Sequence, residues 1–233
     1  MLKAIIFDVD GTLAETEEAH REAFNLVFEQ SGLGWYWSTA LYRELLKVMG
    51  GKERIRHYAD TEGITGISAA DIDSLHRLKT TRYAELLPRS IELRPGVERL
   101  IDECLSRSIR LAIASTTTEP NIYALDQAVG GALKLSQFEV VVGGITVPEK
   151  KPSPRVYEVA LAKLGLEPEE AIAIEDAIAG VTAARGAGLR CLASPCSYTA
   201  EHDLSQATAI VEHLSDRGDG KPVTIDYLDL LSD

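Results

Sequence analysis

The sequence has little cysteine, few basic side chains for its acidic content, and no long apolar run. Its three cysteines, Cys104, Cys191 and Cys196, have no CxxC spacing and no neighbouring histidine pattern. Neither a disulfide framework nor a cysteine metal site is therefore indicated, and reduced thiols are expected. Lysine and arginine number 24 against 36 acids, giving a net charge of −12. That balance argues against nucleic acid or an anionic membrane as the main partner.

No apolar stretch reaches the roughly 18–20 residues that span a bilayer. The first residues, LKAIIFDVD, read as a strand ending in acids rather than as a signal or transit peptide. The expected location is the cytoplasm, or the plastid stroma if the source is a plant or an alga, and the expected state is a monomer. A small anionic partner stays open, because a local group of basic side chains can outweigh the average charge.

The chain does have enough apolar residues for a packed core, since 45% of its 233 residues are hydrophobic. From about residue 95, apolar strand-like runs alternate with helical patterns. Strand-like runs lie at 109–116, 138–144, 171–177, 189–194 and 209–212, and helical patterns lie at 96–107, 121–130, 153–165 and 177–188. This alternation predicts a parallel sheet covered on both faces. Ser153 is the predicted N-cap of the helix at 153–165, with Pro154 at its first position.

Residues 15–92 have a different pattern, with four helical stretches and no convincing strand. They read as a helical insert between the first strand and the rest of the sheet. The predicted fold class is therefore α/β, with a Rossmann-like parallel-sheet core formed by 1–14 and 93–233 and a small all-helical domain at 15–92.

The stretch AIIFDVDGTL at 4–13 places Asp8 and Asp10 at the end of an apolar strand. Residues two apart in an extended segment point to the same face, so the two carboxylates are expected to project together. Close carboxylates repel, and one takes up a proton unless a cation lies between them. The segment is either a solvated turn or a cation site, and the apolar run before it favours burial.

Three further strand ends and loops carry polar residues: IAST at 113–116, EKKPSP at 149–154 and IEDA at 174–177. The carboxyl ends of parallel strands lie on one edge of a sheet, where open α/β folds bind ligands. This edge should therefore gather four acids, two hydroxyls and one lysine, namely Asp8, Asp10, Glu175, Asp176, Ser115, Thr116 and Lys151.

Such a group of carboxylates beside a lysine suits a hard divalent cation, and Mg²⁺ fits because it takes oxygen ligands and works beside phosphates. A carboxylate relieved of repulsion in this way can attack phosphorus covalently. Lys151 and Ser115 would then neutralise and hydrogen-bond the phosphoryl oxygens.

The four motifs, DVDGT, a hydroxyl after IA, a lysine before proline and ED after an apolar strand, resemble those of haloacid dehalogenase-like phosphohydrolases. The resemblance covers the whole chain and makes the helical insert similar to their small cap domain. It implies that Asp8 is the nucleophile that becomes aspartyl-phosphate and that Asp10 is the general acid and base. It also implies that Ser115 and Lys151 stabilise the phosphate.

The resemblance further implies a Mg²⁺ site. Its ligands would be Asp8, the main-chain carbonyl of Asp10 and Asp176, with Glu175 bound directly or through water. The cap is expected to close on two hinge strands, near 13–16 and 88–94.

A closer resemblance is carried by LAETEEAHREAFN, GGKERI at 50–55, STTTEPNI at 115–122 and KKPSP. These stretches are similar to the CbbY-like sugar-phosphate phosphatases, which are associated with Calvin-cycle carbon fixation. The implied substrate is xylulose 1,5-bisphosphate, a by-product that inhibits Rubisco. Arg155 departs from the pattern, since many relatives carry an acid there. The departure should affect the helix start more than the chemistry.

The cap is expected to select the substrate. Gly50, Gly51 and Lys52 open a predicted helix whose free N–H groups and ammonium suit an anion, so they are predicted to hold a second phosphate together with Lys79 and Arg82. Glu17, His20 and Tyr42 are predicted to face the sugar hydroxyls and the reacting centre. Thr116 is divided between a loop-capping role and a phosphate contact.

Three alternatives stay open. A phosphomutase similar to the β-phosphoglucomutases would share the aspartyl-phosphate, so the four motifs do not separate it from a phosphatase. A phosphatase of phosphoglycolate or of a sugar monophosphate would need no second anion site. Lys52 and the glycine pair indicate such a site and therefore favour a bisphosphate. A non-catalytic Mg²⁺-binding module is the alternative from another class, and the intact Asp10 argues against it.

Overall fold

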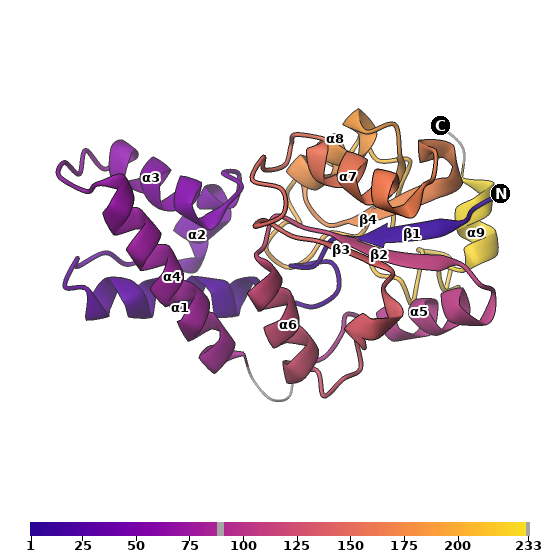
Figure 1. The fold of residues 1–233 in the computed structure, drawn as a ribbon, viewed down its shortest axis with the longest axis horizontal. Coiled ribbons are helices and arrows are strands. Elements are labelled where there is room, and N and C mark those ends of the chain that lie inside the picture. The colour runs from indigo at the N-terminus through magenta and orange to yellow at the C-terminus, as the bar shows by residue number, and fades with distance from the viewer. Residues whose placement is uncertain (88–90, 232–233) are drawn as a thin grey trace. The chain divides into compact units, whose positions relative to one another are not determined.

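The computed structural model describes residues 1–87 and 91–231. The chain divides into two compact units, the first formed by Met1–Glu15 with Arg89–Asp233 and the second by Thr16–Pro88 (Figure 1). Each unit is described by itself below. Of the two predicted hinges, the one near 88–94 includes residues 88–90, which lie outside the described residues. No helix in the described part of the chain has the length and apolar composition that crossing a bilayer requires.

The first unit is built on a six-stranded sheet in the order β3-β2-β1-β4-β5-β6, and every pair of neighbours is parallel. The strands are β1 (Ala4–Phe7), β2 (Arg110–Ala114), β3 (Val140–Val142), β4 (Ala171–Glu175), β5 (Arg190–Ala193) and β6 (Ala209–Ile210). The predicted α/β fold with a parallel sheet is confirmed. The last strand has two residues because the apolar run at 209–212 is short and its Ile210 is exposed.

Helices cover both faces of this sheet (Figure 1). They are α5 (Val97–Ser106), α6 (Glu119–Ala128), α7 (Arg155–Leu164), α8 (Ile178–Gly186) and α9 (Ile225–Leu230), with short 3₁₀ turns at Leu135–Gln137 and Pro168–Glu170. Within β1, Ile5 and Phe7 pack with α5, α6 and α9, whereas Ala4 and Ile6 pack with α7 and α8. Since both faces are buried, the central strands read as continuous apolar runs rather than alternating ones.

The start of α7 differs from its prediction by one residue. The N-cap is Pro154 rather than Ser153, because the first helical hydrogen bonds of this segment run to the Pro154 carbonyl. The Ser153 hydroxyl accepts a hydrogen bond from the Arg155 N–H at 3.4 Å, so it still satisfies one donor of the helix end. Lys151-Pro152, just before this turn, is a cis peptide bond.

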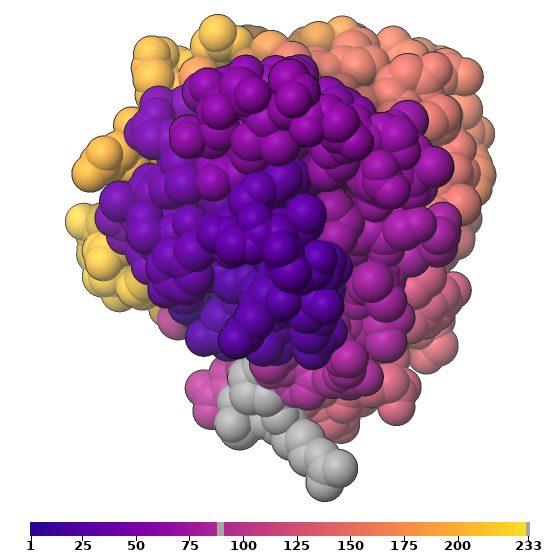
Figure 2. Space-filling model, turned by 90° about the vertical axis from the view of Figure 1, so that its left-hand side faces the viewer, coloured from indigo at the N-terminus to yellow at the C-terminus, as the bar shows by residue number. Residues whose placement is uncertain are grey.

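The second unit contains α1 (Glu17–Gln30), α2 (Thr39–Leu45), α3 (Gly51–Thr61) and α4 (Ala69–Leu86), and residues 16–87 hold no strand. Its core is aromatic, with Phe24, Phe28 and Tyr42 packed around the fully buried Trp37. Figure 2 shows this part of the chain from outside, where the early indigo residues and the later purple residues lie side by side, as the packing of α1 on α4 requires.

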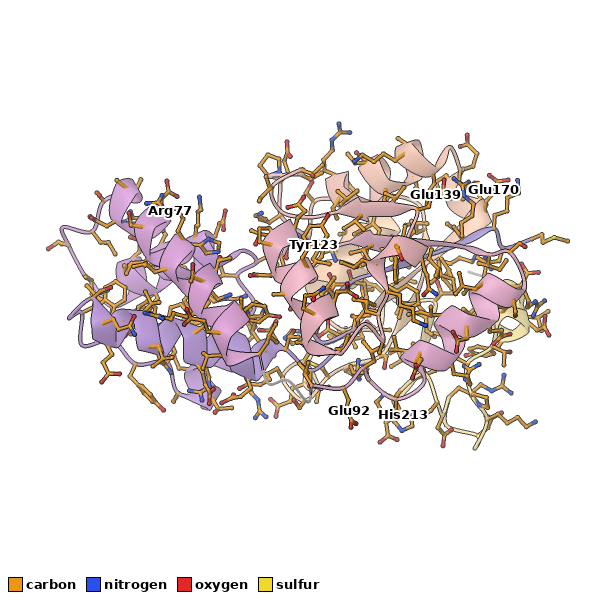
Figure 3. The ribbon with its side chains drawn as sticks, turned by 60° about the horizontal axis from the view of Figure 1, so that its bottom comes forward. Arg77, Glu92, Tyr123, Glu139, Glu170 and His213 are labelled. Carbon is orange, nitrogen blue, oxygen red and sulfur yellow. The ribbon has the colours of Figure 1, made fainter. Side chains whose placement is uncertain are left out.

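Exposed ion pairs lie at the amino ends of the strands. Lys3 pairs with Glu170 before β1 and β4, and Arg110 pairs with Glu139 at the start of β2 and β3. Glu139 and Glu170 are both labelled in Figure 3. Exposed pairs of this kind contribute little to stability. The opposite, carboxyl edge of the sheet holds the buried charges described next.

Candidate active site

The register of the parallel strands fixes which side chains meet at the carboxyl edge. Phe7 is level with Ile113 of β2 and Ile174 of β4, so Asp8, Ala114 and Glu175 follow at the same height. The Asp8 N–H donates to the Ile174 carbonyl at 3.0 Å, which extends this alignment past the end of β1. The sheet itself therefore brings Asp8 and Glu175 together.

Asp8, Glu175 and Asp176 form a buried carboxylate cluster, with one oxygen from each lying within 4.8 Å of the others. Their exposed fractions are 7%, 1% and 3%. Asp10 is less buried, and Gly11, which follows it, turns the chain with a φ of +77°.

Lys151 is the buried cation of the cluster. Its ammonium donates to Asp8 Oδ1 at 2.6 Å, to Glu175 Oε1 at 2.6 Å and to the Ala114 carbonyl at 3.0 Å, which uses all three of its N–H groups. Burial alone would lower the pKa of Lys151, but the attraction of Asp8 and Glu175 raises that pKa above its ordinary value. The lysine is therefore charged at neutral pH.

Lys151 compensates the negative charge of the Asp8 carboxylate only in part. Burial raises the pKa of Asp8, the charge of Lys151 opposes it, and repulsion from Glu175 adds to it, so the pKa stands at about 7. Three carboxyl groups thus surround one ammonium in a buried space. All the cluster's acceptors are oxygens, so the residues present fit a hard divalent cation.

Tyr157 of α7 is a member of the site that the sequence pattern missed. Its hydroxyl donates to Glu175 Oε1, and its ring centroid lies 5.0 Å from the Lys151 ammonium. Gly180 of α8 lies against the same carboxylate, since a Cβ there would lie 1.9 Å from Glu175 Oε2. Glu175 is therefore fixed from three sides. Tyr157 went unnoticed because a tyrosine on the apolar face of a helix reads as core.

Asp176 is oriented by the loop after β5, which was also missed. The Thr199 hydroxyl donates to Asp176 Oδ2 at 3.0 Å and accepts from the Cys196 N–H at 2.9 Å. A Cβ at Gly11 would lie 2.4 Å from Asp176 Oδ2, so only glycine fits at that close approach. Thr199 lies in an irregular segment that offers no sequence pattern to find it by.

Arg94 ties two of these loops together. Its guanidinium donates to the carbonyl of Gly11, to Ser194 O at 2.7 Å and to Pro195 O at 2.7 Å, and it pairs with Glu15 at 3.2 Å. The arginine is 8% exposed, so its partners are needed to offset the burial of its charge.

The loop after β2 carries the predicted hydroxyls. Ser115 is buried, its N–H donates to the Val142 carbonyl at 3.0 Å, and its Oγ accepts from the Thr117 N–H at 3.2 Å. Thr116, the next residue, is partly exposed. Ser115 and Lys151 thus reach the carboxyl edge from different segments of the chain, and Thr116 follows Ser115 on its loop.

Two of the predicted substrate residues of the helical unit meet directly. The Tyr42 hydroxyl donates to Glu17 Oε2 at 2.9 Å and accepts from Arg54 Nη1 at 2.9 Å. Arg54 is buried and was not predicted. Buried Arg54, buried Tyr42 and half-buried Glu17 thus form a polar network beside the aromatic core of this unit.

His20 and Lys79 form a second pair. The Lys79 ammonium contacts His20 Nδ1, and the His20 ring stacks on Tyr83 with centroids 3.9 Å apart. Lys79 also lies 4.9 Å from the centroid of Phe24. Both side chains are buried, in contrast to the usual solvated lysine on a helix.

The predicted anion site is only partly assembled. Gly50 is the N-cap of α3, and Gly51 packs so closely on Phe24 and His76 that a Cβ there would lie 2.6 Å from the His76 ring. Lys79 and Gly51 both lie against the Phe24 ring. Lys52, however, pairs with Asp73 at 2.6 Å, and Arg82 pairs with Glu85 at 2.6 Å.

Comparison with known proteins identifies the family of this chain. A model of the haloacid dehalogenase-like hydrolase family matches residues 2–188. The protein CbbY of Rhodobacter capsulatus is 48% identical over 215 residues, covering 92% of this chain and 94% of CbbY. CbbY of Cereibacter sphaeroides is 46% identical over 220 residues, covering 94% and 95%.

A solved structure of a CbbY protein is also similar to this chain. The crystal structure of a CbbY mutant from Rhodobacter sphaeroides in complex with xylulose-(1,5)bisphosphate has a TM-score of 0.89 to this chain. It is 43% identical and covers 99% of this chain and 100% of its own. The resemblance predicted from the four motifs is confirmed. The chain belongs to the haloacid dehalogenase-like hydrolases and, within them, to the CbbY-like proteins.

Proposed function

We propose that this protein is a Mg²⁺-dependent phosphatase that hydrolyses a phosphate monoester of a sugar bisphosphate, with xylulose 1,5-bisphosphate as its substrate. The buried cluster of Asp8, Glu175 and Asp176 around Lys151 is the observation that carries the proposal. The choice of substrate is supported by the related CbbY that was crystallised with xylulose-(1,5)bisphosphate.

The cation site consists of the Asp8 and Asp176 carboxylates and the main-chain carbonyl of Asp10, with Glu175 bound directly or through water. These oxygens favour Mg²⁺, which keeps few protein ligands and shares its shell with phosphate. When bound, the ion neutralises the carboxylates and polarises a phosphoryl oxygen. The excess of carboxyl groups over cations around Lys151 supports this assignment.

The reaction proceeds in two displacements. The Asp8 carboxylate attacks phosphorus, the ester P–O bond breaks, and Asp10 gives its proton to the departing sugar oxygen. Asp10 then takes a proton from water, which attacks the phosphorus of aspartyl-phosphate and restores Asp8. Such covalent catalysis splits one difficult step into two easier ones. Lys151 and Ser115 compensate the charge on the phosphoryl oxygens throughout, and Thr116 contacts the same group.

The helical unit selects the substrate in this proposal, so residues 15–92 act as a specificity cap on the catalytic core of 1–14 and 93–233. Gly50, Gly51 and Lys52 bind the phosphate that does not react, and Lys52 exchanges its ion pair with Asp73 for that phosphate. The pair with Asp73 is half-exposed and therefore weak enough to exchange.

Lys79 and Arg82 support the same phosphate, and Glu17, His20 and Tyr42 read the sugar hydroxyls. A Lys52→Ala variant tests this cap assignment. It should lose its preference for bisphosphates over monophosphates, and an unchanged preference would contradict the anion site.

The whole proposal is tested by incubating the protein with Mg²⁺ and a panel of sugar mono- and bisphosphates and phosphoglycolate, while following free phosphate and sugar products. We expect phosphate release from xylulose 1,5-bisphosphate with ribulose 1,5-bisphosphate spared. Isomerised sugar phosphate without net release would instead identify a mutase. No release from any of these or from an aryl phosphate would indicate a binding module.

A further inference from the structure

Two loops at the carboxyl edge are held together by one carboxylate outside the cluster. The first, residues 115–118, joins β2 to α6 and begins with Ser115. The second, residues 143–150, follows β3 and leads directly into Lys151. Glu119, the first residue of α6, lies between them.

The Glu119 carboxylate accepts four hydrogen bonds from the second loop. Its Oε1 accepts from the Gly143 N–H at 3.1 Å, the Thr146 N–H at 3.1 Å and the Thr146 hydroxyl at 2.6 Å. Its Oε2 accepts from the Ile145 N–H at 3.1 Å. Three backbone donors of one short loop thus depend on a side chain from another segment, and each would be left unpaired without it.

The backbones of the two loops also touch. The Gly144 N–H donates to the Thr117 carbonyl at 2.7 Å, and the Lys150 ammonium donates to the Gly144 carbonyl at 3.1 Å. A Cβ at Gly144 would lie 2.4 Å from the Thr116 carbonyl oxygen. This contact therefore needs glycine, and it fixes the second loop directly against the loop that carries Ser115.

The role of Glu119 could be limited to stabilising the start of α6, where the helix dipole favours a negative charge. The geometry argues for more, because the four hydrogen bonds described above run to residues 143–146, which belong to neither α6 nor the loop before it. The carboxylate joins two segments whose far ends carry the two groups that face the phosphoryl oxygens.

We propose that Glu119 is a positioning residue for phosphoryl transfer, which fixes the separation of Lys151 from Ser115 by clamping loop 143–150 onto loop 115–118. This inference rests on the proposed function. Glu119 acts through the two loops and not on the reacting atoms. A displacement of about 1 Å between catalytic groups can lower a rate about 100-fold, so a clamp of this kind has a measurable effect.

The test compares Glu119→Ala, Glu119→Gln and Thr146→Val with Glu149→Gln, which removes an exposed charge from the same loop. Phosphate release from xylulose 1,5-bisphosphate and amide exchange over 143–150 are measured on the same preparations. Glu119→Ala should lower kcat about 10- to 100-fold with KM nearly unchanged, and amide exchange in the loop should accelerate.

Glu119→Gln should be intermediate, because its carbonyl oxygen can still accept the three bonds that Oε1 accepts while its amide opposes the Ile145 N–H. Thr146→Val should show the same split between kcat and KM on a smaller scale, and Glu149→Gln should match the unsubstituted protein. A role limited to stability would lower the melting temperature and leave kcat per folded molecule unchanged.

The inference is overturned if Glu119→Ala retains kcat within twofold while exchange over 143–150 rises, or if Glu149→Gln loses as much activity as Glu119→Gln. Should Glu119→Ala fail to fold, Glu119→Gln and Thr146→Val decide by the same criteria. Absence of phosphate release from the unsubstituted protein would overturn the proposed function, and this inference with it.

Discussion

Asp8 is a buried carboxylate whose charge the fold compensates only in part. Its pKa is raised to about 7, mainly by burial, against an ordinary value of 3.8. Between these two values the folded state binds a proton that the unfolded state has released. The free energy of unfolding of the metal-free protein therefore contains a contribution from Asp8 that falls as pH rises from about 4 to about 7.

Replacement of Asp8 by asparagine should remove that contribution. In the presence of a chelator, the free energy of unfolding of Asp8→Asn relative to the unsubstituted protein should shift in favour of the variant as pH rises from 5 to 8. Denaturant unfolding at a series of pH values measures this shift. The test is how the difference in unfolding free energy changes with pH. Its absolute size is not informative, because the variant also weakens a contact of Lys151. A difference independent of pH would contradict the raised pKa.

Glu119 should show the opposite dependence on pH. Partial burial alone would raise the pKa of Glu119, but hydrogen bonds from Thr146 and from backbone N–H groups lower it below 4.5. The stability that its carboxylate contributes is complete above 4.5 and is lost as pH falls through the lowered value. The unfolding free energy of the unsubstituted protein should exceed that of Glu119→Gln at pH 7, and the gap should close as pH falls below 4.5. A gap that widened in acid would be inconsistent with this contact.

Asp8, Glu175 and Lys151 could be located from the sequence because strand ends are readable and parallel strands share an edge. Tyr157 could not, since a tyrosine on an apolar helix face looks the same whether it packs or donates to a carboxylate. Thr199 lies in an irregular segment whose path no periodicity predicts. The chemical roles of the predicted site residues remain predictions.

At the scale of elements, the strands are well predicted and the helix ends less so. The continuous apolar runs at 171–174 and 111–114 are typical of strands that are buried on both faces of a sheet. The start of α7 depends on a local turn in which the Ser153 N–H donates to the Lys150 carbonyl, and its N-cap was predicted one residue early.

Gly180 in α8 illustrates how an element's packing can control the site. Alanine is a better helix former than glycine by about 1 kcal/mol. A Cβ here would nevertheless lie 1.9–2.2 Å from the Glu175 carboxylate, which is held by Lys151 and Tyr157 and cannot move freely. Gly180→Ala should therefore keep the fold but displace Glu175, with kcat lowered about 10-fold or more.

Thermal unfolding and steady-state kinetics on the same sample check this prediction. Gly165→Ala is the comparison variant, because a Cβ at Gly165 meets open space and the φ of +63° makes the substitution costly for stability alone. Full activity of Gly180→Ala would show that Glu175 has room to shift without consequence.

At the scale of the whole molecule, the chain carries a net charge of −12 yet is assigned an anionic substrate. An anionic substrate and a negative net charge are compatible where cations are concentrated locally. Each unit has such buried cations, Lys151 in the first and Arg54 and Lys79 in the second. The helical unit could be predicted from the absence of any strand pattern at 15–92. The pairing of Lys52 with Asp73 could not, because it depends on how α3 packs on α4.

Mg²⁺ should stabilise the whole fold through the carboxylate cluster. A ligand that binds only the folded state adds about 2.7 kcal/mol at 100 times its dissociation constant. The melting temperature should therefore rise with Mg²⁺ and return on chelation, and Asp176→Asn should lose most of the rise. Glu149→Gln, which changes an exposed charge outside the cluster, should keep it. An equal rise in Asp176→Asn would place the ion elsewhere.

A trapping experiment decides whether Asp8 accepts the phosphoryl group. The protein is mixed with Mg²⁺ and xylulose 1,5-bisphosphate, quenched during turnover and reduced with borohydride, which converts an aspartyl-phosphate to homoserine. Peptide mass spectrometry then locates the change. We expect homoserine at position 8, its absence in Asp8→Asn, and its absence without substrate. Rapid phosphate release with no modification at position 8, or with a modification at another residue, would show that Asp8 is not the nucleophile.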